Sequence, residues 1–247
     1  MRKYVFIFML CNTFMAFAQY CNMEQGTVTN YLTTKIKNGQ TTKDCIIVEK
    51  VSDEGGRVKV EVAKYGDSYT PSQVRRKINR SSYVYDKNHG TTEYVVLDSD
   101  AENQASRKFF ETGYPAGKAN EDDFAKFRED IWAKGKISFL IKDDAKPGDI
   151  VSFCNYEEKL GPGLKFKGNL HGQYLGTEKV DTPAGSFECV KINTENQGDV
   201  LKARRPQYTT EWYAKGIGLV KSESYDKRGK VTERTVLQSI TPSSTAK

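Results

Sequence analysis

The sequence predicts a mainly β protein: a curved antiparallel sheet or open half-barrel with one or two covering helices, which is a β-rich α+β fold. Short runs rich in β-branched and aromatic residues alternate with turn residues along most of the chain. Fourteen Tyr and twelve Phe favour strands over helices. The stretch from Asn120 to Ala133 has the best amphipathic helical spacing in the chain.

Residues 1–18 have the three parts of a secretory signal peptide. Arg2-Lys3 supplies the positive start, Tyr4 to Phe14 is apolar, and Ala16-Phe17-Ala18 is a small-residue cleavage motif. The apolar run is too short to span a bilayer, and no other stretch is long and apolar enough to do so. We therefore expect an exported periplasmic or extracellular protein, cleaved near Ala18 and not transmembrane, with a single β-rich domain over 19–247.

The formal net charge is +6 over 247 residues, and the Lys and Arg residues are interspersed with Asp and Glu. A mild and mixed charge is typical of a solvated surface rather than of a nucleic-acid-binding face. We therefore expect no nucleic-acid partner, while weak attraction to an anionic membrane surface stays open.

Four cysteines follow the expected cleavage point: Cys21, Cys45, Cys154 and Cys189. In an oxidising compartment they permit up to two disulfides, and the sequence does not choose among the three pairings. Cys154 and Cys189 lie in strand-like runs, so buried free thiols are the alternative for these two. The chain has no C-x-x-C pair and no H-E-x-x-H motif, and we expect neither a metal site nor a cofactor.

The first part of the domain is predicted to be a series of hairpins. Asn38-Gly39 is a strong two-residue turn between the runs Thr27 to Lys37 and Thr41 to Val51. Gly55-Gly56 makes the next turn, and the following strand alternates valines with polar residues from Val58 to Ala63. Further strands are expected at Arg75 to Ile78, Ser81 to Tyr85 and Glu93 to Leu97, which suits an antiparallel meander.

The middle of the chain is predicted to contain the helical part. Asp100 to Glu111 is polar and is expected to form a short helix or an ordered loop. Asn120 can cap the helix that runs to Ala133, with Asp123 at its third position. This helix either packs on the sheet or forms a lid over an apolar cavity. Strands are expected next at Ile137 to Ile141 and Ile150 to Tyr156.

The most patterned stretch runs from Val180 to Ser224. Thr182-Pro183-Ala184-Gly185 is a turn that leads into the strand Phe187 to Ile192. Cys189 and Val190 interrupt the alternation of that strand, which indicates either a bulge or a strand covered on both faces. In the next strand Trp212 is expected on one face, with Glu211 and Tyr213 on the other. Gly216-x-Gly218 is a bend rather than a nucleotide motif, because no helical pattern follows it.

The residues TPAGSFECVKI and EWYAKGIGLVKSE in this stretch carry a family resemblance. They resemble the TapB-like group, an uncharacterised secreted domain family of Gram-negative, Bacteroides-type bacteria, whose members share a TPAG-[ST]-F-x-C strand and a W-[YF]-x-x-G-[IV]-G-[LM]-[VI]-K strand. The resemblance is greatest over 136–240. It implies a curved antiparallel sheet similar to the lipoprotein-carrier half-barrel, and it assigns no active-site residue.

No catalytic constellation is found in the sequence. The histidines are His89, in a turn, and His171, beside a glycine, and there is no G-x-S-x-G motif. A Cys189 nucleophile paired with His171 is formally possible, but a cysteine in an apolar strand has a raised pKa. We therefore expect a protein that is not an enzyme and has no catalytic residues.

The favoured functional expectation is a binding or carrier protein for an apolar or amphipathic, lipid-like small molecule. The ligand-pocket candidates are Trp212, Phe139, Phe124 and Phe127, and the alternative for each of them is ordinary core packing. A cell-envelope protein-interaction module and an unrecognised hydrolase are the other functional hypotheses.

Overall fold

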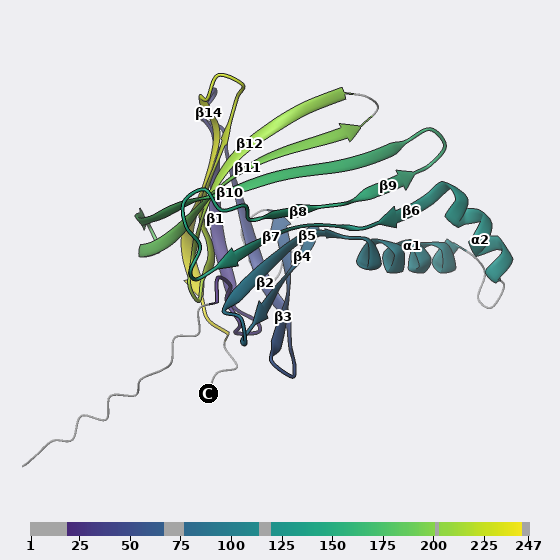
Figure 1. Cartoon of the computed structure of the whole chain (residues 1–247), viewed down its shortest axis with the longest axis horizontal. Helices are drawn as coiled ribbons and strands as arrows, with labels where there is room; N and C mark the ends of the chain where they lie inside the picture. Colours follow the sequence, from purple (N-terminus) through teal and green to yellow (C-terminus); the bar gives the residue numbers. More distant parts are fainter. Residues whose placement is uncertain (1–18, 67–76, 114–119, 201–202, 244–247) are drawn as a thin grey trace, which may run out of the picture.

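The computed structural model describes residues 19–66, 77–113, 120–200 and 203–243 (Figure 1). The predicted signal peptide, residues 1–18, and the start of the strand predicted at Arg75 lie outside the described residues. Neither of the helices described below is long and apolar enough to cross a bilayer.

The described residues form one large open antiparallel sheet with two helices, which confirms the predicted fold class. The strand order is β6-β9-β10-β11-β12-β13-β14-β1-β2-β3-β4-β5-β7-β8. The helices are α1 (Ser99–Gly113) and α2 (Glu121–Asp130). The strands are β1 (Val28–Lys35), β2 (Thr41–Glu54), β3 (Arg57–Gly66), β4 (Lys77–Asp86), β5 (Thr91–Asp98), β6 (Ile131–Lys134), β7 (Lys136–Lys142), β8 (Ser152–Cys154), β9 (Glu157–Leu160), β10 (Lys165–Thr182), β11 (Gly185–Val200), β12 (Ala203–Ala214), β13 (Gly218–Tyr225) and β14 (Val231–Thr241).

The hairpins that the turn residues predict are present. β2 and β3 are joined by the two residues Gly55-Gly56, both with positive φ. β1 and β2 are joined by the five residues 36–40, which include Asn38-Gly39, so the hairpin is present but the predicted two-residue turn is wrong. The predicted strand Ile150 to Tyr156 is shorter than expected, because only Ser152–Cys154 pairs with β7. Ile150 instead forms an isolated bridge to Gln173 of β10.

A kinked two-stranded ribbon connects β5 to β10. One side of the ribbon is β6 and β7, which are separated by Gly135, and the other is β8 and β9, which are separated by Asn155 and Tyr156. Gly135 has φ of 88°, and a Cβ on it would overlap the backbone carbonyl oxygen of Asn155. The two kinks are held together by Lys136 N–H, which donates to Asn155 Oδ1 at 2.7 Å, and by Asn155 N–H, which donates to Lys136 O at 3.0 Å. The kink lets β7 pair with β5 while β9 pairs with β10.

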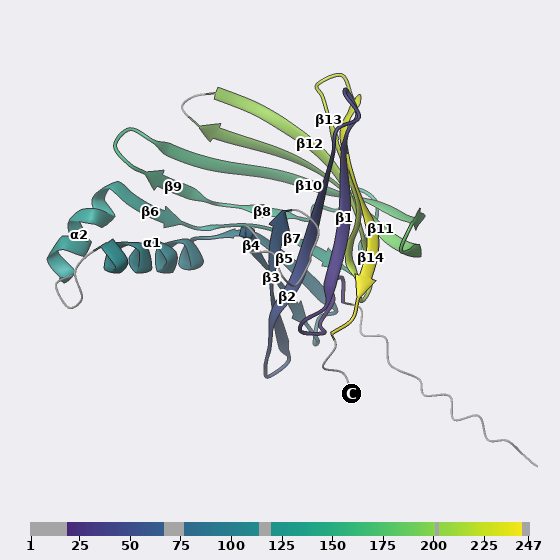
Figure 2. The same cartoon turned by 180° about the vertical axis from the view of Figure 1, so that it is seen from behind.

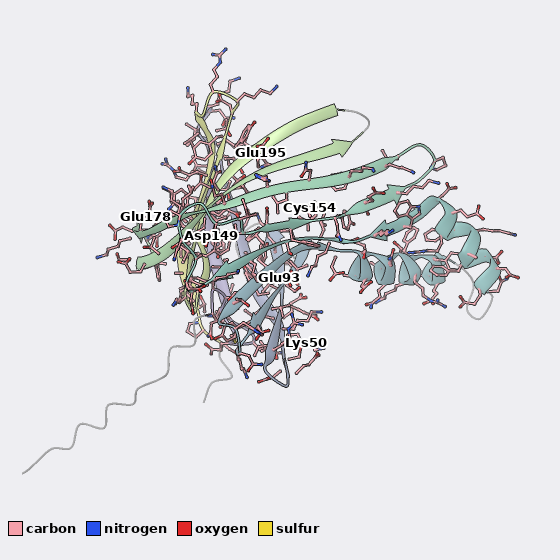
Figure 3. All side chains as sticks on the ribbon, viewed as in Figure 1. Lys50, Glu93, Asp149, Cys154, Glu178 and Glu195 are labelled. Atoms are coloured by element: carbon pink, nitrogen blue, oxygen red, sulfur yellow. The ribbon has the colours of Figure 1, made fainter. Side chains whose placement is uncertain are left out.

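β8 also lies against β10 outside the regular ladder. Just before β8, Val151 N–H donates to Gly172 O at 3.0 Å, and within β8 the Cys154 thiol donates to Gly168 O at 2.6 Å. Figure 3 shows Cys154 at this junction, between the curved sheet and the part that carries the helices. These contacts brace the two parts of the sheet, although the sheet itself remains open.

The main core lies inside the curve of the sheet. It contains Val58, Val60 and Val62 of β3 together with apolar residues of β4, β5, β7 and β10 to β12. Tyr20 and Cys21 of the N-terminal segment belong to the same core. That segment is tied down by Tyr20 N–H, which donates to Thr92 Oγ1 at 3.0 Å. The first residues of the predicted mature chain are therefore part of the folded interior.

β11 is covered on both faces, which settles one of the alternatives left by the sequence. Val190 belongs to the main core, whereas Cys189 belongs to a second, smaller core with Val180, Trp212 and Val220. The pairing of β11 with β12 continues without a register shift at these residues, so there is no bulge there. The run of adjacent apolar residues reflects two cores rather than an irregular strand.

The helical part partly differs from the prediction. α2 begins as predicted, since Asn120 Oδ1 accepts from Asp123 N–H at 2.8 Å. The helix ends at Asp130 rather than Ala133, because the next residues form β6 and pair with β9. Asp100 to Glu111 lies within α1, which is longer than α2. Both helices lie together at one end of the molecule, far from β1 and β14 (Figures 1 and 2).

Candidate functional site

Four aromatic rings form what we call the aromatic floor: Tyr83, Tyr94, Phe139 and Tyr213. Strand pairing brings three of them together, because Tyr94 lies opposite Tyr83 of β4 and Phe139 of β7. The ring centroids of Tyr94 lie 4.7 Å from Tyr83, 4.9 Å from Phe139 and 6.3 Å from Tyr213. Such distances are typical of favourable aromatic pairs. The floor therefore joins β4, β5 and β7 to β12 across the interior of the curve.

Glu211 is a carboxylic acid on the same face of β12 as the aromatic floor. Tyr213 donates a hydrogen bond from its hydroxyl to Glu211 Oε2 at 3.2 Å. The side chain is half-buried, and burial raises the pKa of Glu211 to about 7, although the hydrogen bond from Tyr213 acts in the opposite direction. In the described part of the chain, Glu211 has no ion-pair partner. A half-covered acid beside aromatic rings can donate a hydrogen bond when protonated and bind a cation when charged.

The main core is bordered by apolar side chains that are only half covered. They include Tyr94 and Val96 of β5, Phe166 of β10 and Leu219 of β13. Tyr31 donates a hydrogen bond to Leu219 O at 2.8 Å and so fixes the backbone of β13 beside the aromatic floor. Half-covered apolar residues around a single polar group are the usual surface for an amphipathic ligand.

The structure distributes the four predicted pocket residues over three places. Phe139 belongs to the aromatic floor, whereas Trp212 lies in the second core on the opposite face of the sheet. Phe124 and Phe127 pack on Phe110 of α1, each with a centroid distance of 5.3 Å. The four residues therefore do not line a common pocket, because β-strand alternation sends Trp212 outward and α2 packs on α1.

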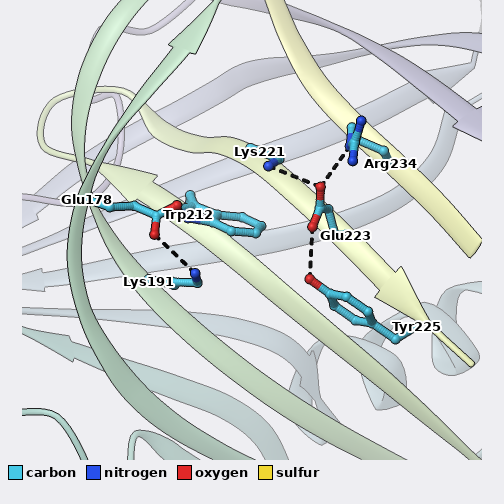
Figure 4. A network of polar contacts seen from close by, with 7 residues as sticks. All are labelled: Glu178, Lys191, Trp212, Lys221, Glu223, Tyr225 and Arg234. Carbon is cyan, nitrogen blue, oxygen red and sulfur yellow. Dashed lines mark hydrogen bonds and ion pairs between the residues drawn. The ribbon is translucent and has the colours of Figure 1, made fainter. Parts of the chain in front are cut away.

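Trp212 lies at the centre of a polar network on the outer face (Figure 4). Its indole N–H donates to Glu178 Oε1 at 2.6 Å. Lys191 Nζ lies 5.1 Å and Lys221 Nζ lies 4.4 Å from the centroid of the indole ring. Lys221 also pairs with Glu223 at 3.0 Å. A lysine ammonium over an indole ring is attracted to the face of the ring, and a paired carboxylate holds the ammonium in that position. Trp212 is only 2 % exposed, so this network is a structural clamp across β10 to β13.

The sequence missed Glu211 as a candidate. Strand alternation predicts that Glu211 and Tyr213 share a face, as they do. Glu211 nevertheless has the same local pattern as a glutamate exposed to solvent. The signal that could have found it is the aromatic residue two positions away, because alternation places that residue on the same face.

The structure does not bring Cys189 and His171 together. The strand partner of Cys189 on β10 is Glu178, seven residues along from His171, which corresponds to roughly 23 Å. Burial, the main cause, raises the pKa of the Cys189 thiol to about 12, so this group is not a ready nucleophile. Among the described residues, no group of three or more His, Cys, Asp or Glu is arranged to hold a metal ion.

The cysteines are described as thiols rather than disulfides at Cys21, Cys154 and Cys189, and Cys45 is fully buried. Cys21 belongs to the main core and Cys189 to the second core, on opposite faces of the sheet. Cys154 and Cys189 are thiols in this structure, and the disulfide pairing stays a prediction.

Glu211 makes the stability of the protein depend on pH. Its folded pKa of about 7 lies above the unfolded value of 4.5, so the folded state binds the extra proton between these values. This stabilisation is fully present below pH 4.5 and is lost as the pH rises through 7. Since the residue is partly accessible to solvent, which weakens the effect, we expect Glu211→Gln to be more stable than the wild type by about 1–2 kcal/mol at pH 8 and nearly equal at pH 4.5.

Urea unfolding of the two proteins at several pH values measures this difference. Glu188→Gln, a change at an exposed glutamate, serves as the control and should leave the pH profile unchanged. If the free energy of unfolding varies with pH in the same way in the wild type and in Glu211→Gln, the raised pKa of Glu211 is contradicted.

Part of the chain is similar to a known family, and its fold is similar to that of solved structures. Residues 172–237 match the DUF3108-like family, and this region contains both strand motifs of the TapB resemblance. The structure is similar to that of a candidate lipoprotein from Parabacteroides distasonis, with a TM-score of 0.60, 19 % identity, and coverage of 90 % of this chain and 98 % of that chain. No curated protein matches the chain.

A second similar structure is that of a candidate exported protein with a YmcC-like fold from Bacteroides fragilis. The TM-score is 0.57 at 17 % identity, over 90 % of this chain and 98 % of that chain. At these identities the likeness concerns the fold. The chain therefore shares nearly its whole fold with two Bacteroidales proteins that are described as exported or as a lipoprotein.

Proposed function

We propose that this chain is an exported, non-catalytic carrier of the TapB-like group that binds a lipid-like amphipathic molecule beside the aromatic floor. The observation that supports this most is Glu211, a half-buried acid next to half-covered aromatic and aliphatic side chains inside an open sheet. The two structural neighbours described as exported or as a lipoprotein support the location.

The proposed binding uses two kinds of contact. The acyl part of the ligand covers the half-exposed apolar residues, and each Å² removed from water contributes roughly 25 cal/mol. Its polar end meets Glu211, which is close to half-protonated at neutral pH. A ligand with one polar end and one chain satisfies both surfaces, whereas a purely polar ligand leaves the rings exposed.

The test is native mass spectrometry after gentle purification, followed by titration with a fluorescent fatty-acid probe. Leu219→Trp adds bulk beside the aromatic floor and is expected to weaken probe binding about tenfold. Phe109→Ala is the control, because Phe109 is 69 % exposed on α1, away from the main core. A protein without bound lipid that also fails to bind the probe contradicts the proposal.

A second candidate function is a cell-envelope protein-interaction module. Ile150 and Phe153 are 61 % and 52 % exposed near the contact between β8 and β10, and Leu175 of β10 is 40 % exposed. Exposed apolar side chains gathered in one area are typical of interaction sites. Ile150→Ser/Phe153→Ser should abolish capture of a partner from envelope extract without affecting probe binding, if this function holds.

A further inference from the structure

Helix α1 lies beside β6, along the outer edge of the ribbon that β6 forms with β9, and the side chain of Asn103 attaches it to the backbone of β6 (Figure 1). Asn103 of α1 donates from Nδ2 to Ala133 O at 3.0 Å, and its Oδ1 accepts from Ala133 N–H at 3.0 Å. Glu158 of β9 is the strand partner of Ala133. These contacts place the first turns of α1 across β6 from Glu158, and Glu102 is near enough for its charge to act on the Glu158 carboxyl.

Tyr156, two residues before Glu158, has a buried hydroxyl without a hydrogen-bond partner. The residue is 1 % exposed, and its ring packs edge-on against Phe166 with a centroid distance of 6.1 Å. The Glu158 carboxyl is near enough to influence this hydroxyl, yet the two do not form a hydrogen bond of normal geometry. An unsatisfied buried hydroxyl costs about 1–3 kcal/mol, so a group that completes it is expected.

Negative charge gathers around this hydroxyl without compensation. Burial first, and then the charges of Glu158 and Glu102, raise the pKa of Tyr156 well above its usual value, and Asp98 adds to the effect. Burial and then the charge of Glu102 raise the pKa of Glu158, whereas its contact with the Tyr156 hydroxyl acts in the opposite direction. Within the described ranges, neither Glu102 nor Glu158 has an ion-pair partner. The nearby guanidinium of Arg128 is bound to the Asn103 side chain and forms no ion pair with either carboxyl. Two carboxyls that no basic side chain pairs with favour a cationic ligand.

The neighbouring basic side chains are bound elsewhere. Lys159 Nζ lies 2.7 Å from Asp130 Oδ1, and Lys167 Nζ lies 2.6 Å from Glu157 Oε1. Glu157 points to the other face of β9 from Glu158, since strand side chains alternate. The charge of the Glu102 and Glu158 pair is therefore not offset by the lysines of the same strands.

We propose that Glu102, Glu158 and the Tyr156 hydroxyl bind a protonated primary amine. An ammonium group has three N–H donors, and the cluster offers three acceptor groups, namely two carboxyls and one hydroxyl. The positive charge offsets the repulsion between the two carboxyls, and the third donor satisfies the buried hydroxyl. A metal ion fits less well, because no group of three or more metal-ligating side chains is arranged to hold one among the described residues. This site is separate from the aromatic floor and does not depend on the carrier function.

The first test is a thermal unfolding titration with ethanolamine and, in parallel, with tetramethylammonium. The two cations have the same charge, but tetramethylammonium has no N–H donor. We expect millimolar ethanolamine to raise Tm by about 2–4 °C and tetramethylammonium to have no effect. Equal shifts with the two cations, or none with either, would overturn the proposal.

Variants then locate the binding. Glu158→Gln should weaken ethanolamine binding at least tenfold and Tyr156→Phe about fivefold. Glu157→Gln is the matched control and should bind as the wild type. Tyr156→Phe removes only an unsatisfied hydroxyl, so it should fold normally in the absence of amine. Wild-type affinity in both Glu158→Gln and Tyr156→Phe would overturn the assignment.

The source of the amine is distinguished with vesicles. Stronger binding to vesicles that contain phosphatidylethanolamine than to phosphatidylcholine vesicles, lost in Glu158→Gln, identifies a lipid headgroup. Equal binding to both vesicles, together with the ethanolamine effect, identifies a free amine.

Discussion

Gly135→Ala is expected to destabilise the protein by about 3–5 kcal/mol. Gly135 has φ of 88°, which an L-residue adopts at a cost, and an added Cβ would overlap the backbone carbonyl oxygen of Asn155. A backbone atom cannot rotate away as a side chain can. The ribbon would therefore have to open where β6 becomes β7 and β8 becomes β9. Guanidinium unfolding followed by circular dichroism measures the loss.

Gly39→Ala is the matched control for this prediction. Gly39 also has positive φ, 66°, but nothing lies within 4 Å of the position its Cβ would occupy. Its substitution should cost only about 1 kcal/mol, the backbone component alone. Equal losses in the two variants would show that the kink tolerates displacement of Asn155.

Trp212→Ala is expected to lower the free energy of unfolding by about 3–5 kcal/mol. The side chain is 2 % exposed, fills the second core and lies beneath Lys191 and Lys221. Its removal leaves a cavity and takes away the donor that meets Glu178. Urea unfolding gives the midpoint and the slope, and an unchanged slope would show that the loss is one of stability rather than of cooperativity.

Two comparisons make the Trp212 prediction specific. Trp212→Phe keeps an aromatic ring but not the N–H, so it should cost about 1–2 kcal/mol. Trp132→Ala changes the other tryptophan, which is half-buried with Lys165 Nζ 5.9 Å from its ring, and should cost about 1 kcal/mol. A loss as large for Trp132 as for Trp212 would argue against the clamp on the outer face.

Local patterns predicted the parts of the fold that local chemistry determines. Gly55-Gly56 specifies its two-residue hairpin turn, because positive φ at both residues matches the strand twist. Asn120 specifies the start of α2, because its side chain satisfies the N–H of Asp123. The end of α2 could not be predicted from the helical stripe. Ile131 and Trp132 continue that stripe, but pairing with β9 draws them into a strand.

The candidate site was less predictable, because it depends on which faces of which strands the curved sheet brings together. Phe139 and Trp212 are both apolar strand residues, and only the curvature of the sheet decides that one is inside and the other outside. Tyr94 reaches the aromatic floor through neighbours that are distant in the sequence, such as Tyr213. Glu211 becomes unusual only after rings from other strands surround it. Tyr213, two positions away, indicates a shared face, but it does not show that this face is covered.

The side-chain amide of Asn103 covers part of an exposed sheet edge. β6 is the outermost strand at its end of the sheet order, and Asn103 occupies both backbone groups of Ala133 that a strand from another copy would use. Unprotected edges of this kind recruit further chains and lead to fibres. The side chain of Asn103 on α1 thus blocks the pairing of β6 with another copy of the chain. Such pairing would first require α1 to detach from β6.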